Sequence, residues 1–122
     1  MNMQVEYNFA NKIQSYRQVQ TKLLNYLISM NILKDINCVN NDGNTILHWA
    51  STYDLLDIAK YLIDNGANVN VYNKKGLSPL HLACFYGHLI IIDLLESNGA
   101  DKNTEDNKGY IPLQYFMLYS IG

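Results

Sequence analysis

Apolar residues follow helical spacing in two stretches of the chain, and each stretch ends at a turn signal. The stretches 58–63 and 91–95 place apolar side chains on one face of a helix. An Asn-Gly pair follows each stretch, as is typical of the residues just past a helix end. A shorter helical segment precedes each stretch and breaks near Asp54 in one case and near Gly87 in the other. The pattern therefore predicts a unit of two short helices and a turn, present twice.

These landmarks recur at one fixed offset along the chain. Thr-Ile-Leu-His-Trp-Ala at 45–50 aligns with Ser-Pro-Leu-His-Leu-Ala at 78–83, and Gly43 aligns with the glycines at 76 and 109. Thr45 and Ser78 are suited to cap a helix N-terminus, and a proline follows Ser78 at a first-turn position where its missing N–H costs nothing. A fixed period of this kind identifies a repeat array, in which each unit buries its apolar face against its neighbours.

The repeated residues resemble the ankyrin repeat. That family has the pattern Asp-Gly-x-Thr-x-Leu-His-x-Ala followed by Leu-Ile-x-x-Gly-Ala-Asn-Val-Asn, and residues 42–70 and 75–103 match it nearly letter for letter. The resemblance is strong over residues 36–114. It implies an all-α ankyrin-repeat solenoid of stacked helix-turn-helix units, slightly curved, with β-hairpin-like fingers projecting on one side.

The resemblance divides the chain, taken as a single ankyrin-repeat domain over residues 1–122, into four units. Residues 1–40 match a degenerate N-terminal capping repeat, and their apolar positions fit either one long helix or two. Two complete repeats follow at 41–73 and 74–106. A truncated C-terminal repeat at 107–122 has room for one helix but not for the second.

The truncated repeat departs from the family pattern. Ile111 replaces the capping threonine, Gln114 replaces the motif histidine and Phe116 replaces the small alanine. The segment 115–121 is largely apolar, whereas terminal repeats normally carry a polar outer face. Two interpretations stay open: an unusual end cap, or an exposed apolar end that meets a partner or a second copy of the chain.

Composition and charge exclude several classes of protein. The chain has 122 residues, 48% of them hydrophobic and 16% charged, which suits one compact soluble domain. A net charge of -2 gives no positive field for nucleic acid or anionic lipid, and no apolar run is long enough to cross a membrane. Two cysteines and no secretory signal favour a reducing compartment, the cytoplasm or the nucleus, with secretion as an effector left open. The abundance of asparagine is attributed to an AT-rich coding sequence.

No candidate catalytic or metal site stands out. The resemblance gives His48 and His81 a structural role, in which the imidazole bonds neighbouring backbone and the capping hydroxyl, and His88 also fits a structural position. The histidines and cysteines lack zinc-ligand spacing, Cys84 suits a core position, and no glycine-rich phosphate loop occurs. We therefore expect no catalytic residue, no metal, no cofactor and no enzymatic activity.

The resemblance places partner contacts on a concave surface made of finger tips and the exposed side of each first helix. Tyr53, Tyr86 and Tyr119 are separated by the repeat offset and should line up along this groove. Tyrosine suits contact because it is large, fairly rigid and hydrogen-bonding at its tip, but here it could instead pack against the next repeat. The predicted partner-binding residues are Tyr53, Tyr86, Tyr119, Phe85, Leu118, Tyr72, Lys74, Lys75, Leu77, Asn41, Asp42, Asn44, Lys108 and Tyr110.

The leading hypothesis is a non-catalytic module that binds a protein partner through this groove, with neither nucleic acid nor membrane as a partner. One alternative is a fragment, or a structural or regulatory part, of a larger ankyrin-repeat protein whose next repeat would cover the apolar C-terminal end. Another is a homodimer through that end. The sequence names no partner and does not separate an adaptor from a competitive inhibitor or a pathogen effector.

Overall fold

The computed structural model describes residues 18–31 and 35–120. The chain divides into two compact units, 1–34 and 35–122. In the first unit a helix covers residues 18–29. The expected choice between one long helix and two in the capping repeat depends on residues before 18, which lie outside the described residues. The proposed boundaries of the repeats stay a prediction.

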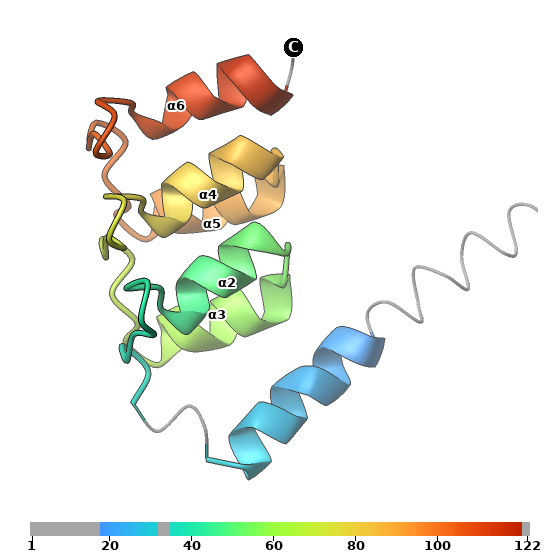
Figure 1. Cartoon of the computed structure of the whole chain (residues 1–122). Helices are drawn as coiled ribbons and strands as arrows, with labels where there is room; N and C mark the ends of the chain where they lie inside the picture. Colours follow the sequence, from blue (N-terminus) through green and yellow to red (C-terminus); the bar gives the residue numbers. More distant parts are fainter. Residues whose placement is uncertain (1–17, 32–34, 121–122) are drawn as a thin grey trace, which may run out of the picture. The chain divides into compact units, whose positions relative to one another are not determined.

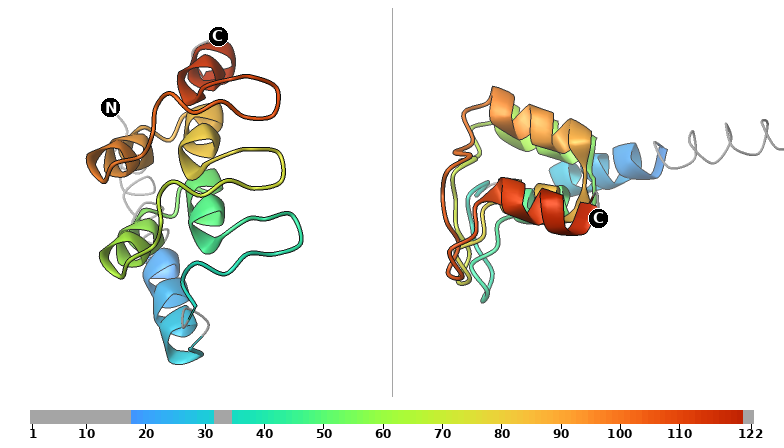
Figure 2. Two further views of the ribbon diagram at one scale, coloured as in Figure 1. Left: turned by 90° about the vertical axis from the view of Figure 1, so that its left-hand side faces the viewer. Right: turned by 90° about the horizontal axis from the view of Figure 1, so that it is seen from above.

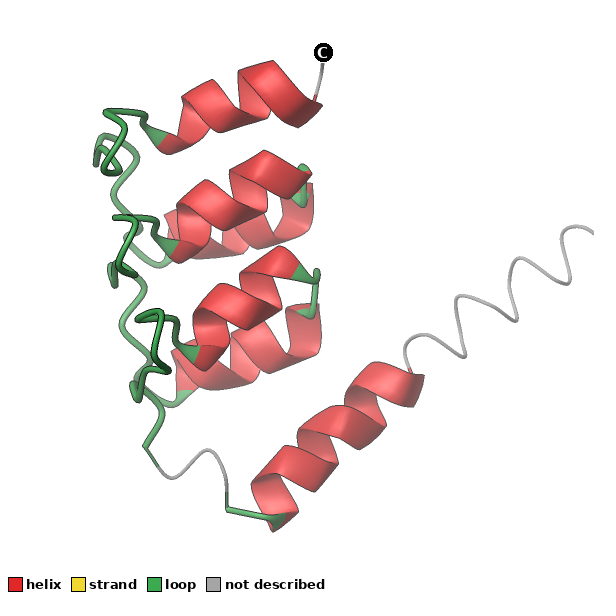
Figure 3. Cartoon of the chain, viewed as in Figure 1, coloured by secondary structure: helices red, strands yellow, loops and turns green. Residues whose placement is uncertain are grey.

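The second unit is a stack of helix pairs. Its helices are α2 (Ile46–Thr52), α3 (Leu56–Asp64), α4 (Pro79–Tyr86), α5 (Leu89–Ser97) and α6 (Pro112–Tyr115), which continues into a π-helical turn, η2 (Phe116–Ser120). The first helices α2, α4 and α6 lie in one layer, and the second helices α3 and α5 lie side by side in another (Figure 1). Helices and loops make up the described ranges, which contain no strand (Figure 3). The predicted all-α array of helix-turn-helix units is therefore confirmed.

Side-chain hydrogen bonds fix where α2 and α4 begin. The Thr45 hydroxyl accepts the backbone N–H of His48 at 3.2 Å, and Nδ1 of His48 accepts the backbone N–H of Thr45 at 3.0 Å. Ser78 and His81 repeat this arrangement at 3.2 and 3.1 Å. The predicted caps are confirmed, and each one satisfies backbone N–H groups that a helix N-terminus otherwise leaves without a partner.

The last repeat keeps half of this cap. Ile111 has no side-chain oxygen, so it cannot accept the N–H of a residue in the first turn of α6. Gln114 takes the place of the histidine, and its Oε1 accepts the backbone N–H of Ile111 at 2.8 Å. The amide thus reproduces the histidine's bond to its own N-cap.

The two motif histidines also tie each repeat to the next. Nε2 of His48 lies 2.9 Å from the carbonyl oxygen of Leu77, and Nε2 of His81 lies 2.9 Å from that of Tyr110. Because a carbonyl can only accept, Nε2 carries the proton in both rings and Nδ1 accepts from the N-cap residue. Both rings are buried, and this burial lowers the pKa of His48 and His81, although the bonds to carbonyl groups act against it.

We expect the protein to lose stability as the pH falls below about 6.5, the usual pKa of histidine. Because the folded pKa of His48 and His81 is lowered, the unfolded chain takes up protons more readily than the folded chain. The stability that the neutral rings contribute is therefore fully present above the pKa that histidine has in the unfolded chain. It is lost as the pH falls from that value through the lowered pKa of the folded chain. Denaturant unfolding between about pH 8 and pH 5 measures this loss.

The matched control is the double variant His48→Gln/His81→Gln, which installs the residue that Gln114 already provides in the last repeat. We expect this variant to be less stable at neutral pH, because glutamine cannot reproduce every bond of the imidazole. Its stability should change much less over the same pH range. A loss of equal size in the variant would mean that other groups cause the acid sensitivity.

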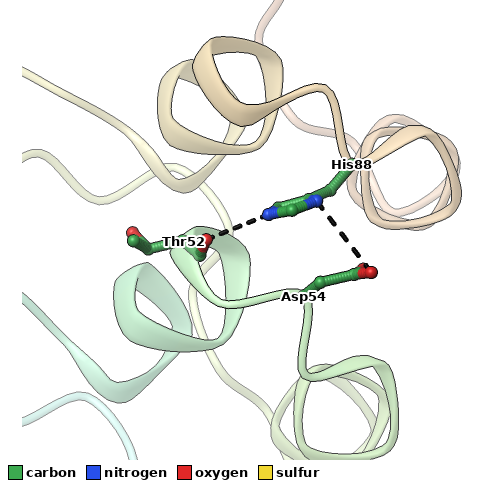
Figure 4. A network of polar contacts seen from close by, with 3 residues as sticks. All are labelled: Thr52, Asp54 and His88. Carbon is green, nitrogen blue, oxygen red and sulfur yellow. Dashed lines mark hydrogen bonds and ion pairs between the residues drawn. The ribbon is translucent and has the colours of Figure 1, made fainter.

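A residue in the left-handed region turns the chain between the helices of each complete pair. Asp54 has φ 58°, and Gly87, at the equivalent position of the next repeat, has φ 71°. The predicted breaks near Asp54 and Gly87 are confirmed, and aspartate is one of the few residues other than glycine that adopt this region readily. His88 connects the two turns, since its Nε2 lies 3.0 Å from the Thr52 carbonyl oxygen and its Nδ1 lies 3.9 Å from the Asp54 carboxylate (Figure 4). His88 therefore holds the structural position that the sequence predicts.

Apolar side chains from both layers form the core of the second unit. They comprise the motif leucines and alanines of α2 and α4 together with the inward faces of α3 and α5. Cys84 is also buried, as its core assignment predicts. The core side chains that are at most 1% exposed are Leu47, Ala50, Ile58, Ala59, Leu62, Leu80, Ala83, Ile91 and Leu95.

Candidate functional site

Three fingers project from the same side of the stack (Figure 2). Asn40, Asn73 and Asp106 occupy the same position in the three fingers. The Oδ1 atom of each accepts the backbone N–H groups two and four residues further on, at 2.9–3.0 Å. One short side chain therefore holds the turn at each finger tip and presents the residues that follow it.

Hydrogen bonds also join neighbouring fingers to one another. The backbone N–H of Lys74 donates to the carbonyl of Asp42, and that of Asn107 donates to the carbonyl of Lys75, both at 3.0 Å. The side-chain amide of Asn107 adds a bond of 2.8 Å to the carbonyl of Lys74. These bonds fix the spacing of the tips, so that the three fingers form one wall.

Two hollows lie between this wall and the first helices. They share Lys75, Leu77 and Leu82, so the two hollows adjoin along the array. We call the two hollows together the groove. The first hollow, of about 300 Å³, is lined by Asp42, Asn44, His48, Trp49, Thr52, Asn73, Lys74, Lys75, Leu77 and Leu82. The second, of about 530 Å³, is lined by Lys75, Leu77, His81, Leu82, Phe85, Tyr86, Asp106, Asn107, Lys108, Tyr115 and Tyr119.

Aromatic rings cluster along the groove. Trp49 stacks on Tyr53 with ring centroids 5.7 Å apart and planes within 2° of parallel. The ring centroid of Phe85 lies 4.8 Å from that of Tyr86 and 4.7 Å from that of Tyr119, which belongs to the last repeat. The three equivalent tyrosines are 51–60% exposed. About half or more of each of these residues is therefore accessible to solvent beside the groove.

The predicted partner-binding residues fall into three groups. Some line the first hollow and some the second, while others line neither. Tyr53, for example, reaches the first hollow only through its stack on Trp49. Those that line a hollow are Asp42, Asn44, Lys74, Lys75, Leu77, Phe85, Tyr86, Lys108 and Tyr119; those that line neither are Asn41, Tyr53, Tyr72, Tyr110 and Leu118.

Nine residues that line the hollows are absent from the predicted set: His48, Trp49, Thr52, Asn73, His81, Leu82, Asp106, Asn107 and Tyr115. Trp49, Leu82 and Tyr115 form a series among them. These three residues occupy the same position of successive repeats. In the two complete repeats it lies between the motif histidine and the motif alanine, and in the last repeat it lies between Gln114 and Phe116. The signal that could have found them is helical spacing, because Trp49 and Tyr53 are one turn apart on the same face.

The charges at the groove are mixed but include a basic rim. Lys74, Lys75 and Lys108 lie at the finger tips, against Asp42 and a buried Asp106. Burial opposes the charge on Asp106, but hydrogen bonds from the Tyr115 hydroxyl and from backbone N–H groups outweigh it and lower the pKa of this carboxyl. Asp106 is thus ionised and serves to hold the structure. The exposed lysines are the most numerous charged groups that a partner would meet at the finger tips.

The described residues give no sign of a reactive centre. They contain no cluster of three or more histidine, cysteine or acidic side chains suited to a metal. Burial raises the pKa of the Cys84 thiol to about 12, so the thiolate is scarce at neutral pH. Within the same ranges no helix is long and apolar enough to cross a membrane. A concave surface with exposed aromatic rings is an arrangement that suits binding.

Comparison with known proteins adds two findings. The family model for ankyrin repeats in three copies matches residues 13–115. Over 35 residues the chain is 43% identical to the E3 ubiquitin-protein ligase Ufd4 of Drosophila melanogaster. That similarity covers 29% of the chain and 1% of the ligase, so the chain corresponds to a very small part of that relative.

Proposed function

The chain belongs to the ankyrin repeat family, and from this premise we propose that it binds a protein partner through the groove and has no catalytic role. Ankyrin repeats are typically protein-binding modules. The similarity to a ubiquitin ligase concerns 1% of that protein and gives no reason to assign ligase activity to this chain.

The observation that carries the proposal is the set of exposed aromatic rings fixed on helices beside the groove. The stack of Trp49 on Tyr53 and the cluster of Phe85, Tyr86 and Tyr119 offer large apolar faces with hydroxyl groups at their edges. Such residues dominate binding energy at interfaces because they bury much area and lose little conformational freedom. Their attachment to packed helices lowers the ordering cost further.

The finger tips favour one kind of partner over others. Lys74, Lys75 and Lys108 form a basic rim beside the aromatic floor. A partner segment with apolar side chains toward the helices and acidic groups toward the tips would match both features. The rim charges would mainly accelerate association, while the aromatic floor would set the lifetime of the complex.

The test is a comparison of the wild type with the triple variant Tyr53→Ala/Tyr86→Ala/Tyr119→Ala. Affinity capture identifies the partner, and titration of the purified partner then gives the two dissociation constants. We expect the triple variant to bind at least about 30-fold more weakly, because truncation of a hot-spot aromatic residue costs about 2 kcal/mol or more. All three side chains are more than half exposed, so the variant should keep its helical content.

The matched control removes Tyr26, a tyrosine that lines neither hollow, is not among the predicted partner-binding residues and is 56% exposed. The variant Tyr26→Ala should bind as the wild type does. If the triple variant keeps full affinity, the partner binds elsewhere on the chain and the proposed site is wrong.

The C-terminal end of the array favours a second candidate function. Leu113 and Met117 are 56% and 57% exposed there, which is unusual for side chains of this kind at the solvated end of a stack. Such an end suits contact with another polypeptide, either further repeats of a larger protein or a second copy of this chain.

A further inference from the structure

An apolar hollow of about 430 Å³ lies where α5 meets α6 and η2, away from the groove. We call it the C-terminal hollow. In the first two helix pairs a second helix lies beside each first helix, whereas no such helix accompanies α6 within the described residues. The hollow is lined by Leu80, Cys84, Leu89, Ile92, Glu96, Lys102, Asn103, Ile111, Pro112, Leu113 and Phe116.

A comparison of equivalent positions in α3 and α5 shows which side chains of α5 lack a covering helix within the described residues. Ala59 of α3 is fully buried, whereas Ile92, its equivalent in α5, is only partly buried. Leu56 of α3 is half-buried, whereas its equivalent Leu89 is 63% exposed. The packing of α3 against α5 accounts for the difference, because α5 has no described helix on its other side. The face of α5 that a neighbour would cover is therefore left open.

The open face of α5 is apolar. Leu89 is 63% exposed, and Ile92, which also lines the C-terminal hollow, is only partly buried, whereas its equivalent in α3 is the smaller and fully buried Ala59. Apolar side chains left in water forgo the gain of burying their surface. The end of an array that stays in water is expected to be polar instead. The composition of α5 thus indicates a face that is covered in the functional state.

The charged residues of the C-terminal hollow indicate which partner covers this face of α5. Glu96 and Lys102 both line the C-terminal hollow, and no ion pair joins them in the part of the chain that the structure describes. An apolar floor with one free acid and one free base at its edge is complementary to itself. In a two-fold arrangement the acid of each copy faces the base of the other, as an isologous interface requires.

We propose that two copies of the chain associate through the C-terminal hollow, with α5 of each copy against the hollow of the other. Leu89 and Ile92 supply the apolar contact, and Glu96 of one copy pairs with Lys102 of the other. The interface leaves the groove free. The dimer is therefore independent of the proposed groove function, and either one can fail without the other.

The test is sedimentation equilibrium over a wide range of protein concentration with charge-reversal variants. The wild type should show a concentration-dependent dimer. Glu96→Lys and Lys102→Glu should each weaken it about tenfold or more, because each homodimer would bring like charges together at both pairs. An equimolar mixture of the two variants should restore association, because opposite charges then meet at both pairs. A wild type that stays monomeric, or a mixture that associates no better than the separate variants, would overturn the proposal.

Apolar variants locate the interface independently of charge. Leu89→Lys should abolish the dimer without a loss of helical content, because Leu89 is 63% exposed. Leu118→Lys, at a leucine that is 59% exposed and does not line the C-terminal hollow, should leave the dimer intact. The triple tyrosine variant of the groove should also remain dimeric. A dimer that survives Leu89→Lys would place self-association on another surface and refute the proposal.

Discussion

Replacing Leu80 by alanine is expected to lower the free energy of unfolding by about 2–5 kcal/mol, the usual cost of truncating a buried leucine. Leu80 is 1% exposed and belongs to α4, which packs against α2, α5 and α6. The cavity would therefore weaken the centre of the stack and the contacts that join successive repeats. Because small domains are stable by only about 5–15 kcal/mol, this loss is a large part of the total.

Thermal unfolding followed by circular dichroism measures the effect. For a unit of this size we expect Tm to fall by roughly 10 °C or more. Leu118→Ala is the matched control, because it removes the same atoms from a side chain that is 59% exposed, and it should change stability by about 0.5 kcal/mol or less. Equal effects of the two substitutions would show that the first helices do not carry the core of the stack.

Features that depend on a few neighbouring residues are predictable from the sequence. Thr45 caps α2 through atoms only three residues away, and Ser78 does the same for α4. The turn at Asp54 needs only one residue that tolerates a positive φ. The fixed period of the repeat then carries each local prediction to the next unit, which is why the helix pairs could be placed without a structure.

Contacts between repeats are less predictable, because they join residues that are far apart along the chain. Asn37 accepts the backbone N–H of Asn68 at 2.9 Å, and Asn70, the equivalent of Asn37 in the next repeat, accepts that of Asp101 at 2.8 Å. The amide of Asn70 also donates to the carbonyl of Gly99 at 3.0 Å. Attributing the asparagines to base composition was therefore incomplete, since several of them connect one repeat to the next.

The groove was predicted in outline and not in detail. Position within the repeat correctly places Tyr86 and Tyr119 beside the second hollow, because both follow the family pattern. It does not find Trp49, which lines the first hollow and stacks on Tyr53, the residue one helical turn further along the chain. The π-helical turn η2 has no counterpart in α2 or α4, and nothing in the local sequence predicts it.

Replacing Gly76 by alanine is expected to be the second most damaging change, at about 2–4 kcal/mol, from strain in the left-handed region and from lost hydrogen bonding. Gly76 has φ +76° at the tip of the second finger. A Cβ atom there would lie 2.6 Å from Oδ1 and 2.9 Å from the backbone nitrogen of Asn107, and 3.1 Å from Cα of Asp106. The side chain could move aside, but the backbone of the third finger would have to shift, which strains the bond from Asn107 to Lys75.

Gly109→Ala separates the two causes. Gly109 has φ +83°, so alanine there carries the same kind of backbone strain, but a Cβ atom would meet nothing within 4 Å. Gly109→Ala should therefore cost about 1–2 kcal/mol, and the excess for Gly76→Ala measures how tightly the second and third fingers are packed together. Because Lys75, Asn107 and Lys108 line the second hollow, Gly76→Ala should also weaken partner binding at a temperature where the helices remain folded. Equal losses of stability in the two variants would mean that the fingers are not held together as described, and that the wall of the groove is not a fixed surface.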